Sequence, residues 1–146
     1  MVETLRPQTK MDAAIASVVD GLENISFLNE EQTIALKAFI EREDVFAVLP
    51  TGFGKSLIYQ LAPLVGKKLG LSECPVVVVV SPLVALMKEQ IREATKLGLT
   101  AFQLGVHGDA EIRSGHGQLT FGSPVFKFNF RPRRSSPYRR QMLFTP

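Results

Sequence analysis

Hydrophobic residues follow two spacings along this chain, one typical of helices and one typical of buried strands. Spacings of three and four residues predict four helices, over residues 12–22, 30–42, 55–69 and 84–97. Apolar runs predict four strands, over residues 45–49, 76–80, 99–104 and 119–121. Because helices and strands alternate, the pattern predicts an α/β fold with a parallel sheet and flanking helices.

Some of these segments carry stronger local signals than others. Residues 76–80 are five consecutive valines, a composition that suits a central strand and disfavours a helix. Asn29 and Gln32 stand three residues apart at a helix start, the spacing of a capping box. Pro63 falls inside the third predicted helix and is expected to kink or shorten it.

Length and composition indicate one globular domain with two less ordered ends. The chain has 146 residues and is 45% apolar, enough for a single core. Residues 1–10 are polar without a period and predict a flexible N-terminus, and residues 11–124 hold the domain. Residues 125–146 mix aromatic and basic residues with three prolines and predict a disordered tail.

Positive charge is concentrated in that tail. The net charge is +3, but residues 1–124 hold 11 Lys/Arg against 14 Asp/Glu, a net of −3. Residues 125–146 hold six Lys/Arg and no acidic residue, a net of +6. The tail therefore fits nucleic-acid binding, a nuclear-import patch or an inert segment, and the basic pI alone does not indicate a DNA-binding domain.

The single cysteine, Cys74, excludes a disulfide framework and favours a reducing, intracellular compartment. No apolar run approaches the roughly 20 residues that a membrane-spanning helix needs, so no membrane role is expected.

A glycine-containing segment between the predicted strand at residues 45–49 and the helix that follows has the chemistry of a phosphate-binding loop. Gly52 and Gly54 allow backbone N–H groups to converge on an anion, and the helix start adds its positive dipole end. Lys55 would reach the outer phosphates of ATP, and the Ser56 hydroxyl would complete the shell of Mg²⁺. The alternative interpretation is an ordinary strand-to-helix turn.

Two longer strings resemble a known family. Residues 49–61 (LPTGFGKSLIYQL) and 79–90 (VVSPLVALMKEQ) resemble the first RecA-like lobe of RecQ-family DNA helicases, in superfamily 2. Residues 121–124 (FGSP) resemble a short segment that follows a strand in the same lobe. The resemblance covers roughly residues 12–124 and implies a partial RecA-like domain.

The resemblance implies two sets of site residues. Those for ATP and its Mg²⁺ are Gln32, Thr51, Gly52, Phe53, Gly54, Lys55 and Ser56. Those for single-stranded DNA are Ser81, Pro82 and Leu83. Gln32 would read the adenine edge, or it is only the capping-box partner of Asn29. Ser81 would contact the DNA backbone, or it only caps the following helix.

The family's acidic motif, Asp-Glu-x-His, does not occur in this sequence, and its nearest counterpart is Asp109-Ala110-Glu111. The resemblance also implies a second lobe, which would supply an arginine to the γ-phosphate. We therefore expect ATP binding with negligible hydrolysis and no unwinding, in a nuclear, shortened form of a helicase that binds single-stranded DNA weakly. The alternatives are a non-catalytic or dominant-negative interaction protein, working with full-length helicase partners, and a P-loop kinase.

Overall fold

The computed structural model describes residues 7–50, 52, 54–71, 75–106, 117–124 and 142–144. The chain divides into two compact units, Met1–Pro75 and Val76–Pro146, and each is described by itself. The predicted site residues Thr51 and Phe53 lie outside the described residues.

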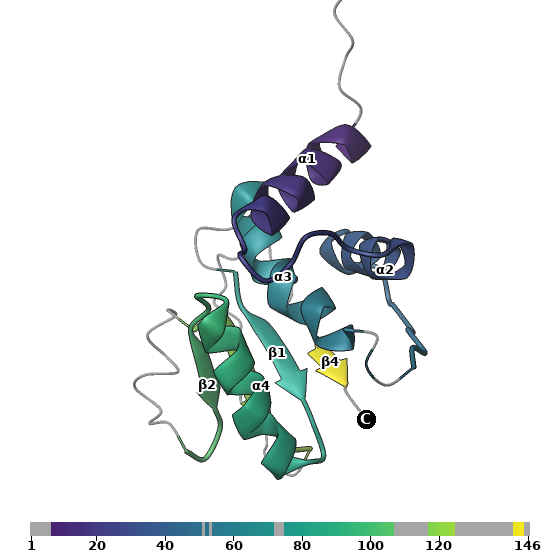
Figure 1. The fold of residues 1–146 in the computed structure, drawn as a ribbon. Helices are drawn as coiled ribbons and strands as arrows, with labels where there is room; N and C mark the ends of the chain where they lie inside the picture. The colour runs from purple at the N-terminus through teal and green to yellow at the C-terminus, as the bar shows by residue number, and fades with distance from the viewer. Residues whose placement is uncertain are drawn as a thin grey trace, which may run out of the picture. The chain divides into compact units, whose positions relative to one another are not determined.

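The first unit consists of helices. They are α1 (Pro7–Asp20), α2 (Glu30–Ile40) and α3 (Lys55–Lys68). Helix α3 contacts both of the others (Figure 1). Leu36 of α2 and Leu61 and Val65 of α3 are fully buried. An ion pair between Lys37 of α2 and Asp12 of α1 adds a polar contact at the edge of this core.

The helix boundaries differ from the prediction at two places. Helix α1 begins at Pro7, so residues 7–10 are helical and the predicted flexible N-terminus does not hold for them. Proline is favoured at the first helical position, where its missing N–H costs no hydrogen bond. Pro63 does not shorten α3, which continues through it to Lys68.

The second unit contains a parallel sheet. Its strands are β1 (Val77–Val80), β2 (Ala101–Gln103), β3 (Leu119–Gly122) and β4 (Met142–Phe144), in the order β2-β3-β1-β4. Strand β1 pairs with β3 on one edge, with Val77 opposite Leu119, and with β4 on the other, with Val78 opposite Met142. All four valines of β1 are buried, as the valine run predicted.

Helix α4 (Val84–Lys96) follows β1 and covers part of this sheet. It contacts β2 and β3 (Figure 1). It buries Met87 and Ala94, while most of its other side chains face solvent. A strand, a helix and a second parallel strand thus follow each other here, as the predicted α/β fold requires. The structure confirms that fold class.

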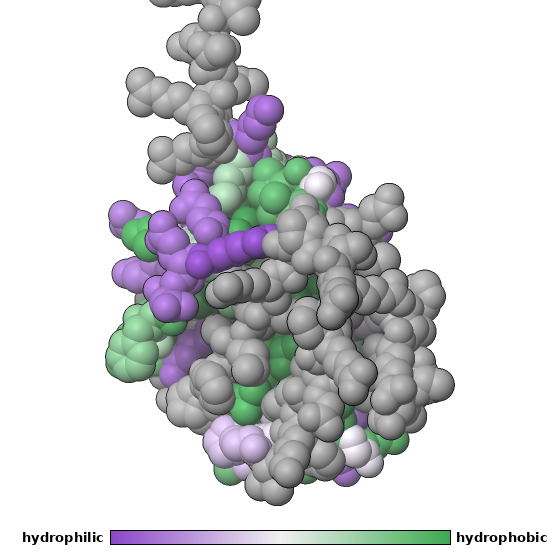
Figure 2. Space-filling view, turned by 180° about the vertical axis from the view of Figure 1, so that it is seen from behind, coloured by the Kyte–Doolittle hydropathy of each residue, from purple (hydrophilic) through white to green (hydrophobic). Residues whose placement is uncertain are grey.

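One predicted strand is wrong. Residues 45–49 have no regular secondary structure, and the side chains of Phe46 and Val48 are 94% and 79% exposed. Figure 2 shows exposed hydrophobic residues beside hydrophilic ones on one face. A strand needs a neighbour to pair its backbone groups, and residues 45–49 pair with none of the described strands. The apolar composition was therefore not sufficient to form a strand.

The predicted disorder of residues 125–146 does not hold for Met142–Phe144, which form β4. These residues are the most apolar stretch near the end of the chain, and pairing with β1 satisfies their backbone groups. The arginine-rich part of the tail, residues 131–140, lies outside the described residues.

Two phenylalanines offer a matched test of this architecture. Phe121 in β3 is fully buried, whereas Phe46 is almost fully exposed. Replacing Phe121 with alanine should lower the free energy of unfolding by about 3–5 kcal/mol, because it removes a core ring and leaves a cavity. Phe46→Ala should change it by less than about 0.5 kcal/mol. Urea denaturation followed by circular dichroism measures both, and a large loss for Phe46→Ala would show that residues 45–49 are packed in solution.

Candidate functional site

The loop that leads into α3 has the backbone of an anion-binding turn. Gly52 and Gly54 adopt φ angles of +84° and +74°, the left-handed region that glycine tolerates best. Gly54 is the N-cap of α3 and supplies no side chain to cap it. The first-turn N–H groups of α3 therefore receive no side-chain acceptor from the N-cap residue, an arrangement that suits a phosphate.

Lys55 and Ser56 are the first two residues of α3, and both are half-buried. The structure thus brings an ammonium group and a hydroxyl to the same helix start as Gly52 and Gly54. A cation at this point would attract the charge of a polyphosphate, and a hydroxyl is a suitable oxygen donor for Mg²⁺. Among the described residues, no three His, Cys, Asp or Glu side chains form a metal-binding group of their own.

Gln32 links helix α2 to this loop. Its Oε1 accepts a hydrogen bond from the Asn29 N–H at 3.0 Å, and Asn29 Oδ1 accepts one from the Gln32 N–H at 2.8 Å. The predicted capping box is therefore confirmed. In addition, Gln32 Nε2 donates to the Gly54 carbonyl oxygen at 3.1 Å, a contact across 22 positions of sequence. The Gln32 side chain thus takes part in the capping box and also contacts the loop before α3.

Gly54 is restricted by this contact as well as by its φ angle. A Cβ atom built on Gly54 would lie 2.5 Å from Gln32 Nε2, closer than real side chains approach. Gly70, at the other end of α3, has a similar φ of +71° but open space where its Cβ would be. The two glycines therefore share a backbone conformation and differ in their surroundings.

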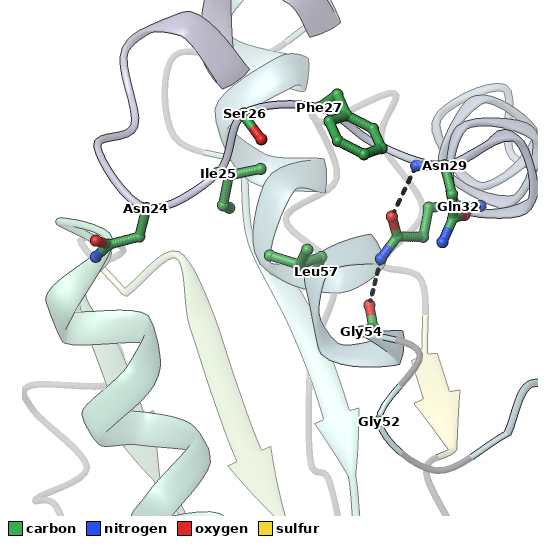
Figure 3. Close-up of a pocket in the computed structure, with 9 residues that line it drawn as sticks. All are labelled: Asn24, Ile25, Ser26, Phe27, Asn29, Gln32, Gly52, Gly54 and Leu57. Carbon is green, nitrogen blue, oxygen red and sulfur yellow. Dashed lines mark hydrogen bonds between the residues drawn. The ribbon is translucent and has the colours of Figure 1, made fainter.

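A cavity of about 330 Å³ lies beside this loop. Figure 3 shows its lining, which comes from the segment before α2, from α2, from the loop and from α3. The lining residues are Asn24, Ile25, Ser26, Phe27, Asn29, Gln32, Gly52, Gly54 and Leu57. Gln32, Gly52 and Gly54 were predicted from sequence as site residues. Phe27 was not, because a single aromatic residue in a loop produces no periodic signal.

The second predicted site lies in the other unit, after β1. Ser81 is buried, and its Oγ accepts a hydrogen bond from the Leu83 N–H at 3.4 Å. The N-cap residue of α4 is Leu83, which makes no side-chain cap. Ser81 therefore stabilises the turn before α4 but is not the N-cap residue. Pro82 and Leu83 are exposed.

A smaller cavity of about 190 Å³ lies at this end of the sheet, where β2 and β3 end and α4 begins. Ligands commonly bind at the carboxyl ends of parallel strands. The lining comprises Val84, Met87, Gln103, Leu104, Gly105, Val106 and Ser123. Ser123 belongs to the FGSP string that the sequence singled out, although no role was predicted for it.

One other prediction cannot be placed. Asp109-Ala110-Glu111, the nearest counterpart of an acidic motif, lies outside the described residues. Among the helices of the described residues, none is both long and apolar enough to cross a bilayer.

Comparison with known proteins finds one family and several relatives. Residues 29–121, more than half of the chain, match the model of the DEAD/DEAH box helicases. A Caenorhabditis briggsae protein assigned as an ATP-dependent DNA helicase Q1 is 42% identical over 113 residues, which cover 76% of this chain and 17% of that protein. The RecQ-like DNA helicase BLM of Xenopus laevis is 38% identical over 97 residues, 66% of this chain and 7% of that protein.

The ATP-dependent DNA helicase Q1 of Mus musculus is 34% identical over 106 residues, which cover 70% of this chain and 15% of that protein. The chain thus spans less than a fifth of the length of these relatives. The matches agree with the resemblance that residues 49–61 and 79–90 carry.

Paired glycine substitutions test the contact between Gln32 and the loop. Gly54→Ala and Gly70→Ala should each lose about 1–2 kcal/mol of stability, because alanine is strained at these positive φ angles. Gly54→Ala should lose about 1 kcal/mol more, since its methyl group displaces the Gln32 amide and breaks that hydrogen bond. Chemical denaturation measures both losses.

In a Gln32→Ala background the additional loss at Gly54 should disappear, while the loss at Gly70 should stay the same. Equal losses for the two glycines in the unmodified chain would contradict the close approach of Gln32 to the loop.

Proposed function

Because this chain belongs to the DEAD/DEAH box helicase family and is similar to its RecQ-like members, we propose that its first unit binds ATP with Mg²⁺. The relatives' names describe ATP-dependent DNA helicases, so we also propose that the second unit contacts single-stranded DNA. The chain would then be a nucleotide- and DNA-binding part of such an enzyme.

One observation carries the ATP proposal: the start of α3 is capped by a glycine with positive φ and has Lys55 and Ser56 in its first turn, beside a cavity. A triphosphate at this position would accept hydrogen bonds from backbone N–H groups and neutralise the lysine. Gly52, Gly54, Lys55 and Ser56 would hold the phosphates, with Thr51 and Phe53 in the same loop. Ser56 would also be an oxygen ligand of the Mg²⁺ that ATP carries. Gln32 would lie on the side of the base.

Replacing Lys55 with alanine tests this site. The dissociation constant for ATP should rise at least about tenfold, because a hydrogen bond to a charged group contributes about 1.5–3 kcal/mol. Isothermal titration calorimetry in the presence of Mg²⁺ measures the change. Lys68→Ala is the matched control, because Lys68 is an exposed lysine in the last turn of the same helix and should leave the affinity unchanged.

The absence of ATP binding in the unmodified, folded chain would overturn the proposal, and so would an unchanged affinity in Lys55→Ala.

Phosphate release measured on the same samples tests the expectation of negligible ATP hydrolysis. We propose that this chain turns ATP over negligibly, because its sequence holds no Asp-Glu-x-His string. DNA-stimulated hydrolysis would contradict that proposal, whereas phosphate transfer to a small acceptor would indicate a kinase.

The DNA proposal rests on the turn at Ser81, Pro82 and Leu83. This turn lies at the carboxyl end of β1 and at the start of α4, whose N-cap residue Leu83 makes no side-chain cap. Such a position suits a phosphate of a nucleic-acid backbone. The cavity next to it, lined in part by Ser123, provides room beside the strand ends. A non-catalytic interaction protein would use the same two sites without hydrolysis.

A charge substitution tests the DNA contact. Leu83 is 51% exposed at the helix start, and glutamate there should repel a DNA phosphate. A like charge at about 4 Å in water costs about 1 kcal/mol, so Leu83→Glu should weaken binding about fivefold. Fluorescence anisotropy with a labelled oligothymidylate at low salt measures this.

The control is Leu71→Glu, which makes the same change at a surface leucine of the other unit. It should leave the affinity within about twofold. If both variants weaken binding equally, the effect would be one of net charge and the turn would have no specific role.

A further inference from the structure

We propose that the cavity beside the turn at residues 81–83 receives one base of the single-stranded DNA. This inference rests on the proposed DNA contact and assigns a ligand to the cavity next to it. Both the turn and the cavity belong to the second unit. The cavity measures about 190 Å³. Sites for whole small molecules enclose about 300 Å³ or more, so this cavity has room for only part of a nucleotide.

A hydrogen bond joins the turn to the wall of the cavity. The Ser81 N–H donates to the Gly122 carbonyl oxygen at 3.0 Å, and the next residue, Ser123, lines the cavity. Val84, which also lines it, directly follows Leu83. Consecutive Cα atoms are about 3.8 Å apart. A phosphate bound at the turn would therefore hold the base of its own nucleotide within reach of the cavity.

The ends of β2 and β3 give the cavity a fixed wall. The Leu104 N–H donates to the Phe121 carbonyl oxygen at 2.8 Å, and the Val106 N–H donates to the Gln103 carbonyl oxygen at 3.2 Å. These bonds hold the backbone of residues 103–106, all four of which line the cavity. A base would thus enter a wall that is already formed, with little cost in backbone ordering.

The lining suits a neutral ring better than a phosphate. It combines apolar side chains with the amide of Gln103 and the hydroxyl of Ser123, and it includes no charged residue. A DNA base likewise has apolar faces and an edge of hydrogen-bond donors and acceptors. A phosphate in the cavity would leave water for an apolar surface without a cation, which is costly. The base is therefore the part of a nucleotide that fits.

Exposed apolar side chains gather at the same place. Among the described residues of the second unit, the exposed large hydrophobic residues are Leu83, Val84, Leu86 and Val106. Two of them line the cavity, and the other two lie at the start of α4. Scattered exposed hydrophobic residues are common, but these four are concentrated at one end of the sheet. Contact with the apolar face of a base would cover part of this surface.

Base insertion and phosphate contact make separable demands on a ligand. An abasic oligomer, in which hydrogen replaces each base, keeps the phosphates and sugars of DNA but has nothing to insert. The unmodified chain should bind oligothymidylate at least about fourfold more tightly than an abasic oligomer of the same length. This ratio corresponds to ~0.8 kcal/mol, the effect of burying one methylene group. Fluorescence anisotropy at low salt measures both affinities.

Filling the cavity should remove this preference. The double variant Val84→Met/Val106→Met lengthens two exposed lining side chains without adding a charge or a ring. Its affinities for the two oligomers should agree within about twofold, while its affinity for the abasic oligomer stays at the level of the unmodified chain. Leu86→Met is the matched control, because Leu86 is exposed on the same helix but does not line the cavity. This control should keep the preference, and circular dichroism checks that both variants are folded.

2-Aminopurine gives a second, optical readout, because stacking on neighbouring bases quenches its fluorescence. The lining contains no aromatic residue, so a 2-aminopurine placed within oligothymidylate should brighten when it enters the cavity. The double variant should abolish this increase.

Three results would overturn the base site: equal affinities of the unmodified chain for the two oligomers, a preference that survives in the double variant, or an unchanged 2-aminopurine signal. If Leu83→Glu weakens binding of both oligomers while the unmodified chain shows no preference, the turn binds DNA and the cavity does not. If the unmodified chain binds neither oligomer, the proposed DNA contact itself fails.

Discussion

The hydrogen bond from Gln32 Nε2 to the Gly54 carbonyl determines how the first unit presents its loop. With it, a single buried amide completes the cap of one helix and fixes the N-cap residue of the next. Because Gly54 has no side chain, the amide can approach that closely. The glycine and the glutamine therefore depend on each other structurally, although 22 positions separate them in the sequence.

Elements that depend on local signals were predictable from the sequence. Helix α2 has its capping box, α4 has one apolar face, and β1 is a run of valines, so each could be recognised from neighbouring residues alone. Residues 45–49 and Met142–Phe144 could not, because a strand forms only where another strand offers hydrogen bonds. The composition of residues 45–49 resembles that of β1, and the difference between them lies in pairing.

The same distinction between local and long-range interactions applies to the candidate site. The spacing of Gly52, Gly54, Lys55 and Ser56 was enough to predict a glycine turn that leads into a helix with a lysine and a serine at its start, since backbone freedom and helix start signals are local properties. The bond between Gln32 and the loop could not be read from the sequence, because it joins two elements that are distant along the chain. Phe27 escaped prediction for a related reason: its place in the cavity lining depends on the fold and not on its neighbours in sequence.

The exposed apolar run at residues 45–49 also bears on how the protein behaves at high concentration. A segment outside the sheet that exposes large hydrophobic side chains, here Phe46 and Val48, can template intermolecular β-pairing and so promote aggregation. Four charged residues precede the run directly: Glu41, Arg42, Glu43 and Asp44. Charges in this position act as gatekeepers, because stacking copies of the chain would bring like charges together. A short, exposed polar segment that lies outside the core would thus oppose association through residues 45–49.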